Sequence, residues 1–97
     1  MMTNNAPYAV ATGRGYQKQA KKFFRQRPNL RPVYDRLLAD LAANPFAPVL
    51  KIHPLSGRLE GIWAVSLTYS YRITLTLLVS EKEITLLDIG DHDTVYR

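Results

Sequence analysis

Apolar residues recur at helical spacing in the first half of the chain. From Tyr16 to Gln26, the positions of Tyr16, Ala20, Phe23 and Phe24 place these side chains on one face of a helix. The basic side chains of the same segment fall on the opposite face. The spacing therefore predicts an amphipathic helix over residues 16–26.

The segment that follows predicts a second helix. Asn29 is the expected N-cap, Pro32 is tolerated in the first turn, and Asn44 and Pro45 end the helix. Because only a few residues separate the two helices, we expect them to pack as an antiparallel hairpin. The buried stripe of the second helix is expected to be Leu30, Val33, Tyr34, Leu37, Leu38 and Leu41.

After Pro48 the pattern changes to the two-residue alternation that is typical of strands. A tight turn is expected near Tyr69, and the adjacent Leu86 and Leu87 indicate a bulge in the last strand. Whether residues 6–12 (Ala6–Thr12) form a short first strand is left open. The other predicted strands are Val49–His53, Leu59–Thr68, Ser70–Val79 and Glu83–Asp91.

The alternation predicts a sheet with one apolar and one polar face. The polar face includes Arg72, Thr74 and Thr76, with Ser66 and Thr68 from the preceding strand. The expected fold is α+β: an N-terminal helical hairpin packed on one face of a mainly antiparallel sheet of four to five strands, with the opposite face exposed. The inward residues are expected to be Trp63, Val65, Leu67, Tyr71, Ile73, Leu75, Leu77 and Val79.

The composition predicts one folded domain over residues 1–97. The chain is 46% apolar and 22% charged, close to the globular average, and has no cysteine for disulfides or thiolate metal sites. No apolar run reaches the roughly 18 residues of a membrane span, and residues 1–15 lack the pattern of a secretory signal. We therefore expect a cytoplasmic protein that is not inserted in a membrane.

The formal net charge of +5 is concentrated in the N-terminal half, where Asp35 is the single acid between Arg14 and Arg36. A one-sided basic block steers a protein toward a polyanion, which can be RNA, DNA, an acidic protein or a membrane surface. A plain solvated face is the alternative, although the cations of the first helix have no acidic partner four residues away. The candidate polyanion contacts on this helix are Lys18, Lys21, Lys22 and Arg25.

The polar face of the sheet carries the candidate chemistry. Cleavage of RNA without a metal requires a base for the ribose 2′-hydroxyl, a cation for the charge on the phosphorane and an acid for the leaving 5′-oxygen. Histidine can serve either proton role, and arginine binds phosphate oxygens in a bidentate way. Each residue also has an ordinary alternative: an ion pair for Arg72 and a turn with the ring bonded to the backbone for His53. For His92 it is a solvated charged turn, and for Tyr96 a terminal position against the core. The residues expected to meet on or beside this face are Lys51, His53, Ser66, Thr68, Arg72, His92 and Tyr96.

Metal and nucleotide cofactors are not expected. The two histidines lie on different predicted elements and have no cysteine to complete a zinc site. The sequence Gly13-Arg14-Gly15 precedes a predicted helix but lacks the P-loop and dinucleotide-binding patterns.

Four short motifs follow the predicted hairpin in order: H-P-L-S-G at 53–57, G-I-W at 61–63, Y-R-I at 71–73 and I-G-D-H-D-T-V-Y at 89–96. This ordered set, over about residues 16–96, resembles the RelE/ParE toxin superfamily, and more narrowly its ribonuclease branch with the YafQ and YoeB types. The resemblance implies a ribosome-dependent endoribonuclease that cuts messenger RNA and is neutralised by an antitoxin encoded beside it.

The resemblance also implies roles for individual residues. By position, His53 is the general base, Arg72 contacts the scissile phosphate, His92 is the general acid and Tyr96 stacks on the substrate base. Lys51 is then an auxiliary phosphate contact, and Ser66 is a further substrate contact. The identity of the base stays open, since Ser66 and Ser70 stand where the YafQ type has a histidine and an aspartate, and Val49 stands where the YoeB type has a glutamate.

Two other functions are compatible with this resemblance. One is a non-enzymatic DNA gyrase poison of the ParE branch, and the other is a catalytically weak module that represses its own operon together with its antitoxin. The expected partners are a cognate antitoxin, messenger RNA and the ribosome with its ribosomal RNA. A larger toxin–antitoxin complex is left open.

Overall fold

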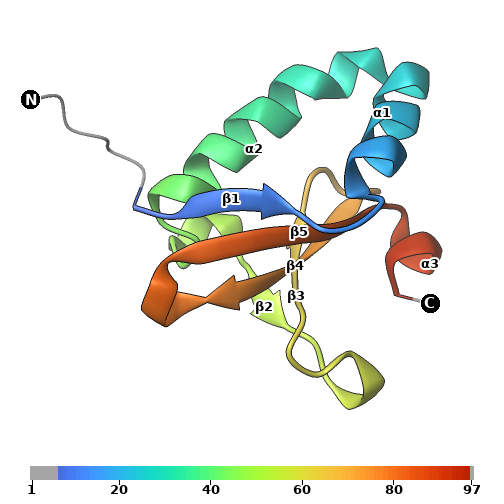
Figure 1. The fold of residues 1–97 in the computed structure, drawn as a ribbon. Helices are drawn as coiled ribbons and strands as arrows, with labels where there is room; N and C mark the ends of the chain where they lie inside the picture. The colour runs from blue at the N-terminus through green and yellow to red at the C-terminus, as the bar shows by residue number, and fades with distance from the viewer. Residues whose placement is uncertain (1–6, 97) are drawn as a thin grey trace, which may run out of the picture.

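The computed structural model describes residues 7–96 and places two helices on one face of a five-stranded sheet (Figure 1). The strand order is β1-β5-β4-β3-β2, and a short third helix follows the last strand. This arrangement confirms the α+β fold with a helical hairpin. The elements are β1 (Ala9–Thr12), α1 (Tyr16–Gln26), α2 (Arg31–Ala43), β2 (His53–Pro54), β3 (Trp63–Ser66), β4 (Arg72–Leu78), β5 (Glu83–Gly90) and α3 (His92–Val95).

Helix α1 has the bounds that its apolar spacing predicts. Gly15 precedes it at φ +80°, a left-handed conformation that suits glycine because glycine lacks a Cβ. Its buried residues are Tyr16, Ala20 and Phe23, and the helix packs against β5. The Nε2 of Gln19 donates to the carbonyl of Ile89 at 2.9 Å, which ties the helix to the end of that strand.

Two predictions about α2 are wrong. Asn29 does not cap the helix, because residues 28–30 form a 3₁₀ turn and α2 begins at Arg31 with Leu30 at the cap position. Val33 is 42% exposed, because the buried positions of α2 follow one another at spacings of three and four residues along another side of the helix. Those positions are Tyr34, Leu37 and Leu41.

The sheet is antiparallel except at one edge. β1 pairs in parallel with β5, with Val10 opposite Ile84. This strand lies within the segment 6–12 that the sequence left open, and Ala6 lies outside the described residues. The predicted bulge is confirmed, because Leu75 pairs with Leu86 while the preceding pair places Asp88 opposite Thr74. Leu87 is thus the extra residue.

The predicted strand Val49–His53 is mostly wrong. Residues 48–50 form a 3₁₀ turn, and Lys51 has a left-handed backbone at φ +52°, so the extended segment shrinks to His53–Pro54. Boundaries of the other predicted strands also move. β3 begins at Trp63, because residues 57–59 form another 3₁₀ turn, and β4 ends before Val79, which lies in a further such turn and is 54% exposed.

The main core lies between the helices and the apolar face of the sheet. The opposite face is more covered than predicted, because Ala64 and Thr74, which pair across β3 and β4, are both buried. Helix α3 packs against β4 and β5, and its Val95 is buried as well. The largest wholly buried core side chains include Tyr16, Leu41, Val65, Ile73, Leu75, Ile84, Leu86 and Ile89.

Within residues 7–96, no helix has the length and apolar character needed to cross a membrane.

Candidate active site

One cleft brings together the four residues to which the sequence assigns catalytic roles. Its volume is about 430 Å³, and it opens between the β2–β3 loop on one side and α3 on the other. Arg72, at the start of β4, lines it as well. The lining residues are His53, Leu55, Ser56, Leu59, Arg72, His92 and Tyr96.

Strand ends position two of these side chains. His53 begins β2 opposite Ala64, and its Nδ1 lies 3.3 Å from the carbonyl oxygen of Lys51. Arg72 begins β4, where its backbone pairs with Ser66 on one side and Gly90 on the other. Its Nη1 donates to the carbonyl of Tyr69 at 3.5 Å, which orients the guanidinium but leaves most of its donors free for a ligand.

A single helical turn positions the other two. Asp91 caps α3 by accepting from the backbone N–H of Thr94 at 2.9 Å. Gly90 lets the Thr94 side chain lie close to the backbone here, because a Cβ at this position would be 3.0 Å from that side chain. His92 and Tyr96 are one turn apart, so their rings meet edge to face with centroids 4.4 Å apart.

The cleft is chemically suited to an anion. Among the residues that line it within the described part of the chain, Arg72 is permanently charged and none is an acid. The His92 side chain is 70% exposed, and its Nδ1 lies 3.8 Å from Oδ1 of Asp93. Two imidazoles that can exchange protons therefore share one hollow with a cation that cannot lose its charge.

Sequence reasoning missed several residues at this site. Leu55, Ser56 and Leu59 line the cleft, and Nη2 of Arg58 donates to the carbonyl oxygen of Tyr96 at 3.3 Å. Leu55 and Ser56 lie inside the H-P-L-S-G motif, so that motif was the available signal for them. Nothing in the sequence pairs Arg58 with a residue 38 positions away.

Lys51 and Ser66 are not among the residues that line this cleft. Ser66 pairs with Arg72 in register and is exposed beside it. Lys51 contributes its carbonyl oxygen near the His53 ring, while its own side chain is exposed. Their roles as substrate contacts stay predictions.

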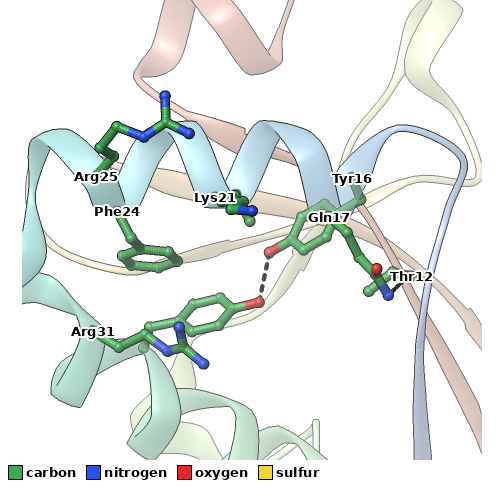
Figure 2. Close-up of a pocket in the computed structure, with 9 residues that line it drawn as sticks. Thr12, Tyr16, Gln17, Lys21, Phe24, Arg25 and Arg31 are labelled. Carbon is green, nitrogen blue, oxygen red and sulfur yellow. Dashed lines mark hydrogen bonds between the residues drawn. The ribbon is translucent and has the colours of Figure 1, made fainter.

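The basic residues of α1 also lie outside the cleft. Lys21 and Arg25 line a separate groove of about 480 Å³, across from Arg31 at the start of α2 (Figure 2). Lys22 lines a smaller hollow that it shares with residues at the end of β5, and Lys18 is exposed. The cations of α1 thus form a second basic surface rather than part of the cleft.

Two tyrosines form the floor of the groove between α1 and α2. The hydroxyls of Tyr16 and Tyr34 are hydrogen-bonded at 3.0 Å. Figure 2 marks this bond of the Tyr16 hydroxyl with a dashed line. Burial, together with the hydrogen bond to Tyr34, raises the pKa of the Tyr16 hydroxyl far above its usual value. The Tyr16 hydroxyl therefore stays neutral. At the rim, the ion pair of Arg31 with Asp35, at 3.0 Å, raises the pKa of the arginine.

Residues 7–96 bring no three histidine, aspartate or glutamate side chains together as a metal ion would require. Neither a protein-family model nor a curated protein matches the sequence.

Several solved structures have a fold similar to that of this chain. YafQ from E. coli strain BL21(DE3) is 17% identical with a TM-score of 0.75, covering 93% of this chain and 99% of that one. YafQ in the E. coli DinJ–YafQ toxin–antitoxin complex is 19% identical with a TM-score of 0.74, covering 94% and 99%. A YoeB/ParE toxin from Agrobacterium tumefaciens is 18% identical with a TM-score of 0.73, covering 86% and 96%. The chain therefore has the RelE-like toxin fold that these YafQ and YoeB structures share.

Proposed function

We propose that this protein is the toxin of a type II toxin–antitoxin system and that it acts in the cytoplasm as an endoribonuclease on ribosome-bound messenger RNA. The observation that carries the proposal is the acid-free cleft in which His53, Arg72, His92 and Tyr96 meet. The toxin fold supports the same conclusion, since E. coli YafQ has this fold and was solved in a toxin–antitoxin complex.

In the proposed reaction the side chains of the cleft act together in one transition state. His53 removes the proton from a ribose 2′-hydroxyl as its oxygen attacks the adjacent phosphorus. Arg72 binds the phosphate oxygens and stabilises the negative charge that grows on them. His92 donates a proton to the departing 5′-oxygen, which leaves one fragment with a 2′,3′-cyclic phosphate and the other with a 5′-hydroxyl. Tyr96 stacks on a neighbouring base.

Programmed ribosomes test this function directly. We expect the purified protein to cut a defined message on the ribosome and to leave 5′-hydroxyl ends that kinase labelling detects, without added metal ions. The same message without ribosomes is the control for ribosome dependence. An intact message, together with loss of gyrase supercoiling activity when the protein is added, would instead support the gyrase poison.

The basic surface of α1 is proposed to contact RNA phosphates. The Lys21→Gln/Arg25→Gln variant is expected to bind programmed ribosomes more weakly, because each lost phosphate contact lowers the slope of log affinity against log salt by about one. Titrations at several salt concentrations measure that slope. The Arg36→Gln/Lys82→Gln variant removes the same charge from exposed positions outside the grooves described above. Equal slopes for the two double variants would show that α1 contributes only general charge.

A further inference from the structure

Arg58 joins the two walls of the cleft. It lies in the 3₁₀ turn at residues 57–59, within the β2–β3 loop, and its neighbour Leu59 lines the cleft. Its Nη2 reaches across to the carbonyl oxygen of Tyr96, which belongs to the opposite wall. Arg58 itself is not among the lining residues. Arg58 therefore contacts the backbone that forms the wall of the cleft and does not line the space that a substrate would fill.

The element that Arg58 holds is short. Helix α3 has four residues, and an isolated helix of that length is unstable in water, so tertiary contacts must keep it in place. Those contacts include the cap at Asp91 and the burial of Val95. The Arg58 bond adds a tie at the far end, where carbonyl groups have no partner inside the helix and favour a cationic donor.

The placement of this turn decides where two catalytic candidates lie. The backbone N–H of Tyr96 donates to the carbonyl of His92 at 3.0 Å, and the rings of the two residues are in contact. A shift of the Tyr96 backbone therefore moves both rings relative to Arg72. Small displacements matter because a misplacement of about 1 Å can lower an enzymatic rate about 100-fold.

We propose that Arg58 is a positioning residue that fixes α3 and Tyr96 against the β2–β3 loop and so sets the geometry of His92 in the cleft. This inference rests on the proposed function. Arg58 is exposed, and a single exposed hydrogen bond contributes little to folding stability, so its loss should leave the fold intact. Its contribution is to the rate at which bound message is cut, not to binding.

The first measurement needs no RNA. Amide hydrogen exchange in the RNA-free protein is expected to be faster at Val95 and Tyr96 in Arg58→Gln than in wild type. Exchange elsewhere in the chain should stay unchanged. Arg58→Lys should lie between the two, because lysine keeps a long, charged donor for the carbonyl, whereas the glutamine side chain is shorter and neutral. Arg36→Gln, an exposed arginine on α2, is the matched control. Unchanged exchange at Val95 and Tyr96 in Arg58→Gln would overturn the proposed tie.

The second measurement is message cleavage on programmed ribosomes. We expect Arg58→Gln to lower the maximal rate constant about tenfold or more, with the half-saturating concentration and the salt slope of binding unchanged. Arg58→Lys should recover part of the rate. If the slope of log affinity against log salt fell by about one, Arg58 would instead be a direct phosphate contact. Faster amide exchange at Val95 and Tyr96 with an unchanged rate constant of cleavage would overturn the positioning role. If wild type does not cut, the proposed function fails while the exchange result still decides the tie.

Discussion

Replacing Arg72 with glutamine is expected to lower the rate constant of message cleavage about 100- to 1,000-fold, the usual cost of removing one donor to a developing oxyanion. Arg72 is the lining residue of the cleft that is permanently cationic, and its backbone is held between β3 and β5. Glutamine keeps a hydrogen-bond donor but cannot supply the charge. Single-turnover cleavage on programmed ribosomes, with enzyme in excess, measures the effect.

Two comparisons separate charge from folding. Arg72→Lys retains the charge but loses the two-pronged contact with phosphate oxygens, so its rate is expected between those of wild type and Arg72→Gln. Thermal unfolding should show the same transition for all three proteins, because the guanidinium donates only to the carbonyl of Tyr69 among the hydrogen bonds described above. A glutamine variant that is folded and cuts at the wild-type rate would remove Arg72 from the proposed reaction.

Replacing either histidine of the cleft with glutamine is expected to lower the same rate constant about 100- to 10,000-fold, the range for loss of a general acid or base. The two variants should differ in their pH–rate profiles. His53→Gln should lose the limb that requires a deprotonated base, whereas His92→Gln should lose the limb that requires a protonated acid. Rates measured from acidic to alkaline pH on programmed ribosomes would assign the two roles.

The double variant provides the control for this assignment. Because acid and base act in one transition state, the rate constant of His53→Gln/His92→Gln is expected to be only slightly lower than that of the slower single variant. His92 is 70% exposed, so its replacement should not alter folding. A His53→Gln protein that keeps both limbs of the profile would transfer the role of base to another group. That result is a real alternative, because the sequence resemblance leaves the identity of the base open.

Local patterns were sufficient to predict most of the framework. The spacing of Tyr16, Ala20 and Phe23 predicted the bounds of α1, and the adjacent Leu86 and Leu87 predicted the bulge in β5. Both features depend on which side chains of one segment meet the core, and periodicity reports that directly. The same method failed at residues 49–53 and at Val79, where 3₁₀ turns replace the expected extended chain. Alternation alone does not exclude such turns.

For the cleft, too, some features could be predicted from the sequence and others only from the tertiary structure. His53, Arg72, His92 and Tyr96 were identifiable from residue type, alternation and ordered motifs, all of which are properties of the chain itself. Three features depended on the fold: the separation of the α1 cations from the cleft, the covering of Thr74 and the tie from Arg58 to Tyr96. Each depends on how distant segments approach in space, which side-chain packing decides and no local pattern records.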